Sequence, residues 1–86
     1  MTYYFIVFAN RAQTMSFYRI LKKYGLNISI INTPASISSI CSISIRFVAE
    51  DYKKIKKLIL SYNFSSFRGI YRYDGNGWKG KTKKVF

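Results

Sequence analysis

The chain has 86 residues, enough for one domain with one modest hydrophobic core. Hydrophobic residues make up 49% of it, too many for a disordered chain, and no apolar run approaches the roughly 20 residues needed to span a bilayer. Fifteen Lys and Arg against 3 acids give a net charge of +12, a field that attracts nucleic acids and acidic proteins.

The first third of the chain predicts a strand, a helix and a second strand. Tyr3 to Phe8 is a run of aromatic and β-branched residues that is apolar on both faces, which is typical of a central strand. Asn10 is a predicted N-cap for a helix over residues 11–24, with Gln13 three residues on as a variant of the capping box. Alternating apolar and polar residues then predict a half-buried strand that ends near Asn32.

The rest of the chain predicts the same kinds of element. The stretch from Ile43 to Phe47 alternates with period two and predicts a strand. The acidic pair 50–51 favours a helix N-terminus, and an apolar stripe continues that helix to Tyr62. Asn63 is a predicted left-handed stop, and Phe67 to Tyr73 reads as the last strand.

The resulting order, β-α-β-β-α-β, predicts an α+β protein with a ferredoxin-like fold. We expect a four-stranded antiparallel sheet with two helices on one face. In this topology the loop between the second and third strands lies at the end of the sheet where the first helix begins. The start of the last strand reaches the same end. Residues 74–86 are expected to form a basic C-terminal tail or an extra strand.

The residue types that the chain lacks exclude most familiar enzyme chemistries. It has no histidine, which excludes His-based triads and the usual zinc sites built on histidine. Two of its acids, Glu50 and Asp51, are adjacent, so on a helix they diverge by about 100° and make a poor catalytic pair. The single cysteine, Cys41, forms no internal disulfide, which fits a reducing compartment. We expect a cytoplasmic protein with no metal and no cofactor.

Cys41 stands at the start of the third strand, in a serine-rich loop that runs from Thr33 to Ser44. The predicted topology places it near Asn10, Arg11 and the N–H groups of the first helix, with Arg68 at the same end of the sheet. A helix N-terminus and guanidinium groups stabilise a thiolate, so we expect the pKa of Cys41 to lie below the ordinary value of about 8.5.

Serine hydroxyls in the same loop are candidate donors to the sulfur. A second interpretation stays open, in which Cys41 is a small buried hydrophobic residue, the commoner fate of a lone cysteine. The candidate donors are Ser36, Ser38, Ser39 and Ser42.

The segment from Thr33 to Phe47 resembles the signature of small bacterial domains described as putative selenium/sulfur carrier protein-like. Those domains read T-P-R-x-I-S-S-S-C-G before a short apolar strand, and this chain reads T-P-A-S-I-S-S-I-C-S. The likeness covers roughly residues 3 to 73. We therefore assign residues 1–73 to a carrier-like domain and leave 74–86 outside it.

The resemblance implies a cytoplasmic thiol carrier, in which Cys41 holds sulfur or selenium as a persulfide or selenosulfide. The implied partners are sulfur- or selenium-transfer proteins such as a cysteine desulfurase or a TusA-type domain, and the protein is more a carrier than an enzyme. Two positions depart from the pattern. Ala35 replaces the arginine that usually follows the proline, and Ser42 replaces the glycine after the cysteine, where positive φ is then less accessible.

A nucleic-acid-binding module is the alternative. The RNA-recognition fold uses the same element order and stacks bases on strand aromatics. Arg46, Arg72 and Tyr4 are the residues predicted to line such a face, yet the third strand lacks the aromatic pattern of that module. The uncovered sheet face and its edge strands also leave a homodimer open. No membrane association is expected.

Overall fold

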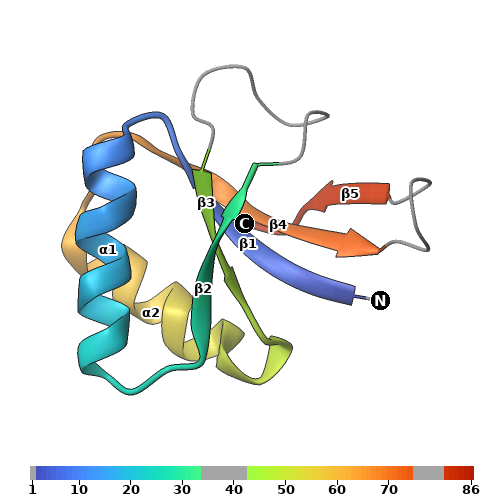
Figure 1. Cartoon of the computed structure of the whole chain (residues 1–86), viewed down its shortest axis with the longest axis horizontal. Coiled ribbons are helices and arrows are strands. Elements are labelled where there is room, and N and C mark those ends of the chain that lie inside the picture. Colours follow the sequence, from blue (N-terminus) through green and yellow to red (C-terminus); the bar gives the residue numbers. More distant parts are fainter. Residues whose placement is uncertain (1, 34–42, 75–80) are drawn as a thin grey trace.

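Five strands, two α-helices and one short 3-10 helix make up residues 2–33, 43–74 and 81–86, the part of the chain that the computed structural model describes (Figure 1). The predictions over 3–8, 11–24 and 43–47 agree with the first strand, first helix and third strand to within one residue. In chain order the elements are β1 (Thr2–Phe8), α1 (Arg11–Lys23), β2 (Ile28–Asn32), β3 (Ile43–Phe47), η1 (Ala49–Asp51), α2 (Tyr52–Tyr62), β4 (Phe67–Asp74) and β5 (Lys81–Lys84).

The strands form one antiparallel sheet in the order β2-β3-β1-β4-β5. β1 is central, as its two-sided apolar sequence predicts, and its Ile6 lies between Ile45 of β3 and Ile70 of β4. The prediction of four strands is wrong, because residues 81–84 pair with β4 and extend the sheet (Figure 1). The chain is thus an α+β protein with an antiparallel sheet and two helices, but an exact ferredoxin-like topology is not confirmed.

Local signals explain where the helices begin and end. The Asn10 side-chain oxygen accepts a hydrogen bond from the Gln13 backbone N–H at 3.1 Å, so the predicted N-cap of α1 is confirmed. Gly25, just beyond α1, has a φ of 73°. Asn63 ends α2 with a φ of 49°, the predicted left-handed stop. The described residues contain no helix that is long and apolar enough to cross a membrane.

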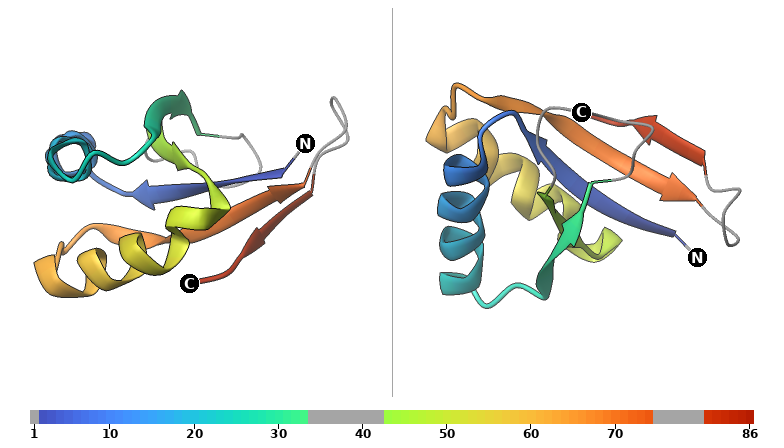
Figure 2. Two further views of the ribbon diagram at one scale, coloured as in Figure 1. Left: turned by 90° about the horizontal axis from the view of Figure 1, so that it is seen from below. Right: turned by 45° about the horizontal axis from the view of Figure 1, so that its top comes forward.

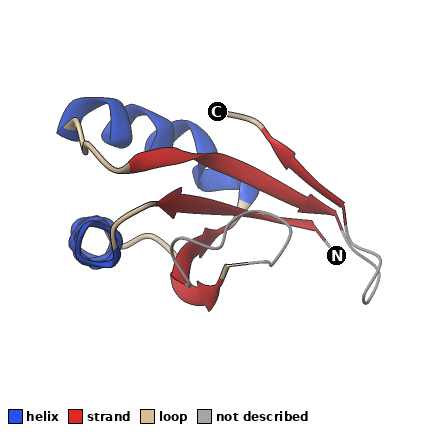
Figure 3. Ribbon diagram, turned by 90° about the horizontal axis from the view of Figure 1, so that it is seen from above, coloured by secondary structure: helices blue, strands red, loops and turns tan. Residues whose placement is uncertain are grey.

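The core lies between the sheet and the two helices (Figures 2 and 3). Alternation along β1 turns Ile6 and Phe8 toward the helices, where the ring of Phe8 lies 5.9 Å from that of Phe17 on α1. Ile55 of α2 and Ile45 of β3 belong to the same buried cluster. One core therefore joins both helices to one face of the sheet.

The opposite face is built from the alternate residues of the same strands. Phe5 of β1 lies between Arg46 of β3 and Tyr71 of β4, and its ring stacks on that of Tyr71 at 5.6 Å and 14°. Although Phe5 points away from the helices, it is fully buried. Beside it, Gly69 has a φ of 148°, and a Cβ added there would lie 2.7 Å from Lys84 Cε. The lysine side chain thus runs over the glycine.

The last residues of the chain are tied to β4 and α2. The backbone N–H groups of Val85 and Phe86 both donate to the carbonyl of Ile70, at 2.8 and 3.2 Å. The hydroxyl of Tyr52 donates to the Val85 carbonyl at 3.3 Å, and the Lys56 ammonium lies 4.8 Å from the centre of the Phe86 ring. The end of the chain is therefore part of the packed structure and not a solvated tail.

Candidate functional site

The described residues fix the two ends of the serine-rich loop. The ladder between β2 and β3 closes on the pair Asn32–Ile43. Beside this pair, the hydroxyl oxygen of Thr33 lies 2.6 Å from that of Ser44, which is fully buried and stands opposite Ile31 in the ladder. Thr33 is the first residue of the motif that carries the family resemblance. The loop therefore starts and ends on a hydrogen-bonded pair of side chains. Residues 34–42, with Cys41, Ser36, Ser38, Ser39 and Ser42, lie outside the described residues, so the predicted placement of the thiol stays a prediction.

The N-terminus of α1 lies at the same end of the sheet as these loop ends, as the topology predicts (Figure 1). Arg11, the first residue of the helix, is exposed. The side-chain oxygen of Asn10 already caps the helix, so only the amide NH₂ of that side chain is left to donate to a ligand. Asn10 and Arg11 thus lie at the loop end of the sheet (Figure 1).

Gln13 does not complete a capping box. Its side-chain oxygen accepts hydrogen bonds from both the backbone N–H, at 3.0 Å, and the hydroxyl of Ser66, and its NH₂ group donates to the Ser65 hydroxyl at 3.2 Å. The capping-box variant predicted from Gln13 is therefore wrong, because the side chain reaches the turn before β4 instead of the backbone N–H of Asn10. This contact joins the start of α1 to the start of β4.

Arg68 lies at the start of β4, beside that turn. Val7 pairs with Gly69 whereas Phe8 pairs with Phe67, so Arg68 is an extra residue in β4 that no residue of β1 opposes. Its side chain is exposed. The structure thus brings Asn10, Arg11 and Arg68 to one end of the sheet.

Carboxylates are placed at the other end of the sheet. The chain has 3 acids, Glu50, Asp51 and Asp74. The first two follow the far end of β3 in η1, and Asp74 pairs with Thr2 at the start of β1. Asp74 also forms a salt bridge with Arg72, in which Asp74 Oδ2 lies 3.0 Å from Arg72 Nε. The loop end of the sheet therefore carries arginines and none of the three acids of the chain.

The residues predicted for a nucleic-acid face do not share one surface. Tyr4 faces the helices, where its ring lies 5.6 Å from Phe47 and 5.5 Å from Tyr52. Arg72 is directly opposite Tyr4 in the register and so lies on the same side, while Arg46 is opposite Phe5 and lies on the other side. The three do not form the aromatic and basic platform that the alternative needs.

Arg46 instead meets Tyr3 on the face away from the helices. Its guanidinium carbon lies 4.5 Å from the centre of the Tyr3 ring, and the ring of Tyr73 lies 5.0 Å from that of Tyr3 on the other side. The pKa of Tyr3 is raised above 10.0, first by burial and then by Tyr73, while Arg46 acts to lower it. Arg46 was predicted to share its face with Tyr4, but the aromatic residue that it contacts is Tyr3.

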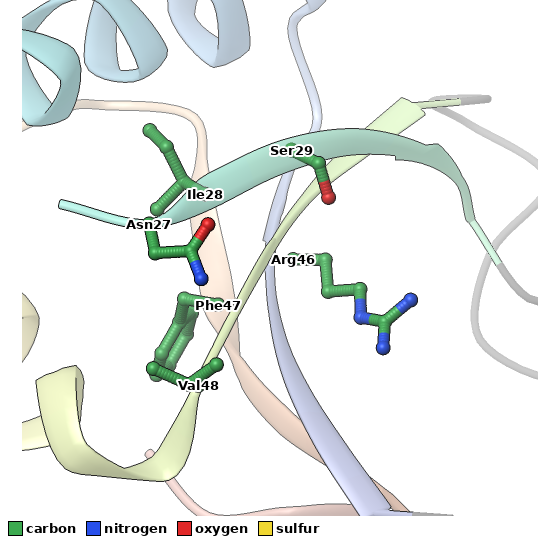
Figure 4. Close-up of a pocket in the computed structure, with 6 residues that line it drawn as sticks. All are labelled: Asn27, Ile28, Ser29, Arg46, Phe47 and Val48. Atoms are coloured by element: carbon green, nitrogen blue, oxygen red, sulfur yellow. The ribbon is translucent and has the colours of Figure 1, made fainter.

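A shallow pocket of about 220 Å³ opens beside Arg46, between β2 and β3 (Figure 4). Sequence reasoning did not mark Asn27 or Ser29, although the period-two pattern of β2 places Ser29 on the face opposite the core. Among the residues that the structure describes, no group of three or more His, Cys, Asp or Glu side chains is placed to hold a metal. The pocket is lined by Asn27, Ile28, Ser29, Arg46, Phe47 and Val48.

These features define a small basic α+β domain in which an antiparallel sheet holds the two ends of a serine-rich loop at one end. The comparison with family models matches residues 3–72 to the family described as "Putative Se/S carrier protein-like". The chain belongs to this family. Neither the curated proteins nor the solved structures gave a match.

Proposed function

We propose that the chain is a thiol carrier, in which Cys41 holds sulfur or selenium and passes it to a partner protein. The observation that carries the proposal is membership of the Se/S carrier-like family together with the presence of a single cysteine. The cysteine lies within the loop whose sequence resembles the family signature. A carrier of this kind needs one accessible thiol and no further catalytic residue, which fits a chain without histidine.

The charge distribution around the loop ends supports this proposal. Exposed Arg11 and Arg68 stand at this end of the sheet with the N-terminus of α1, and all three acids lie at the other end. Positive charge and a helix N-terminus both stabilise a thiolate, the nucleophilic form of cysteine. The hydrogen-bonded pair Thr33–Ser44 holds the loop ends at this position.

The transfer itself requires no external oxidant or reductant. The Cys41 thiolate attacks the outer sulfur of a persulfide on the donor, a new S–S bond forms to Cys41, and the S–S bond within the donor breaks to release its thiolate. A thiol on the acceptor then takes the outer sulfur from Cys41 in the same way. With selenium, the intermediate is a selenosulfide. A cysteine desulfurase is the proposed donor, and a TusA-type domain is a proposed partner.

A lone thiol that must stay reduced between transfers fits the cytoplasm, where thiols are kept reduced. We therefore propose a cytoplasmic location for this function.

Sulfur transfer tests the proposal directly. A cysteine desulfurase supplied with ³⁵S-cysteine is expected to leave label on the protein that is released by a reductant. The Cys41→Ser variant is expected to acquire none. If the intact protein stays unlabelled while a known acceptor in a parallel reaction is labelled, the carrier proposal is wrong.

The rate of alkylation of Cys41 as a function of pH tests the electrostatic part of the proposal. We expect a midpoint below the value of about 8.5 for free cysteine, and a higher midpoint in Arg11→Gln and Arg68→Gln. Arg19→Gln is the matched control, since Arg19 is an exposed arginine further along α1 and is expected to leave the midpoint unchanged. A midpoint at or above that of free cysteine would contradict activation of the thiol.

A further inference from the structure

The pocket beside Arg46 lies on the sheet face that is turned away from the helices, and it is separate from the serine-rich loop. Ser29 and Arg46 are directly opposite each other in the register, four residues before Thr33 on β2 and two residues after Ser44 on β3. These separations correspond to about 13 Å and about 7 Å along the strands. Figure 4 shows the Ser29 hydroxyl turned toward the Arg46 side chain, with the Asn27 amide above Phe47 and Val48. The pocket is therefore a feature that the carrier proposal does not use.

Arg46 in this pocket is a cation without a carboxylate partner. Asp74 forms a salt bridge with Arg72, the other two acids of the chain are in η1, and among the described residues Arg46 forms no salt bridge. The guanidinium of Arg46 instead lies 4.5 Å from the centre of the Tyr3 ring. Contact with an aromatic ring orients the planar guanidinium and leaves its edge N–H groups available to an anion.

The other polar residues of the pocket supply donors of the same kind. The Ser29 hydroxyl and the Asn27 amide NH₂ both donate hydrogen bonds, and both side chains are exposed. A volume of about 220 Å³ is smaller than the roughly 300–1,000 Å³ of pockets for drug-sized ligands. It is several times the share of about 30 Å³ that one water takes in the liquid. The pocket thus has room for an ion of a few heavy atoms with its waters.

From this geometry we propose that the pocket formed by Asn27, Ser29 and Arg46 binds a small tetrahedral oxyanion of the sulfate or phosphate type. The net charge of +12 raises the local concentration of any anion, and the Arg46 guanidinium, which has no carboxylate partner, distinguishes the pocket within that field. The ion occupies the face of β2 and β3 that is turned away from the helices. This binding goes beyond the carrier function and does not depend on Cys41.

NMR titration of the ¹⁵N-labelled protein with sodium sulfate, and separately with sodium phosphate, tests the proposal at constant ionic strength. We expect saturable shifts at the Arg46 side-chain N–H and at the amides of residues 27–29 and 46–48. Arg46→Gln is expected to weaken binding about tenfold or more, because it removes a charge-assisted hydrogen bond. Arg19→Gln, which removes the same charge on α1, is expected to bind as the wild type does.

Two further measurements keep the test decisive. If Arg46→Gln fails to fold, the double variant of Asn27→Ala and Ser29→Ala, which changes two exposed side chains, is expected to weaken binding several-fold. Shifts that do not saturate and are spread over the lysines of α2 would overturn the proposal, as would acetate binding as tightly as sulfate and phosphate. Cys41→Ser is expected to bind the ion normally, and Arg46→Gln to accept sulfur normally, so that each proposal can fail alone.

Discussion

The two faces of the sheet bury their aromatic residues by different means. On the face toward the helices, the ring of Phe8 contacts Phe67, which pairs with it in β4, and it is also covered by Phe17 of α1 and by Phe64 between α2 and β4. On the opposite face, Phe5 is equally buried, yet its ring contacts are with Tyr71 and Tyr3, which stand beside it in the same sheet. One face is thus covered by helices, whereas the other is covered only by ring contacts within the sheet, with Phe5 stacked on Tyr71 of the neighbouring strand.

The two faces of the sheet therefore differ in role: one contributes to stability, and the other is open to binding. A face covered by helices cannot admit a ligand without unfolding, so its side chains serve the core. The other face keeps Arg46 half-buried, and its polar groups remain within reach of water and ions. Because cross-strand pairs such as Phe5–Tyr71 and Tyr3–Tyr73 cover part of the apolar surface there, the domain needs no third layer in order to bury β1.

Replacing Phe8 and Phe5 in turn by alanine gives the largest expected effect. The two residues have the same type, the same strand and the same full burial, and they differ in the face that they occupy. Phe8→Ala is expected to lower the free energy of unfolding by about 3–5 kcal/mol, because the three rings and the helices around it close the cavity only in part. Phe5→Ala is expected to cost at least about 1 kcal/mol less, since its neighbours are free to collapse toward the gap.

Urea unfolding followed by far-UV circular dichroism measures both losses. Equal losses for the two variants would break the comparison, because they would mean that the face away from the helices is as rigidly packed as the core.

Gly69→Ala is expected to have the next largest effect. The backbone at this position has a φ of 148°, which side-chain-bearing residues rarely adopt, and the new Cβ would meet Lys84 Cε at 2.7 Å. We expect a loss of about 1–3 kcal/mol in the free energy of unfolding, mostly from the backbone, because the end of a lysine side chain moves aside easily. The double variant of Gly69→Ala and Lys84→Ala separates the two causes in the same urea experiment. Near-complete recovery of stability in it would show that the clash, not the backbone, sets the cost.

Much of the architecture could be predicted from the sequence because its local signals agree with each other. The cap at Asn10, the left-handed stop at Asn63 and the alternation in β3 all describe short-range chemistry, and the structure confirms them. The sequence did not allow us to predict which residues of β1 face the helices and which face away from them. Every residue from Tyr3 to Phe8 is aromatic or aliphatic, so no polar residue marks the outer face, and only the pairing of Phe5 with Arg46 assigns it.

β5 was predicted only as one of two alternatives for residues 74–86, an extra strand or a basic tail. Lys-Thr-Lys-Lys has no apolar alternation, and its pairing with β4 is accompanied by contacts that Val85 and Phe86 make beyond it. For the candidate site, the sequence predicts which end of the sheet the loop leaves and which arginines stand there. The central prediction for the site concerns the environment of Cys41. Because Cys41 lies outside the described residues, this stays a prediction.

The smallest expected effect is a pH dependence that belongs to the face away from the helices. Burial and the nearby Tyr73 raise the pKa of Tyr3 above 10.0, while Arg46 acts in the opposite direction. A raised pKa in the folded state means that the neutral phenol is favoured by folding. The contribution of Tyr3 to the free energy of unfolding is therefore fully present below pH 10, and it is lost as the pH rises through the folded-state pKa. The free energy of unfolding, measured by urea from pH 9 to 11, is therefore expected to fall less steeply in Tyr3→Phe than in the wild type.

Arg46→Gln sharpens this last prediction. Without the guanidinium, the pKa of Tyr3 is expected to rise further. The free energy of unfolding of Arg46→Gln is therefore expected to fall more steeply with pH than that of the wild type. The double variant of Arg46→Gln and Tyr3→Phe is expected to show the same slope as Tyr3→Phe alone. The other ionisable groups are common to all four proteins, so their contributions cancel in the comparison. A slope that Arg46→Gln leaves unchanged would mean that the guanidinium does not act on Tyr3 in solution, and the orientation of Arg46 toward the anion pocket would lose its physical cause.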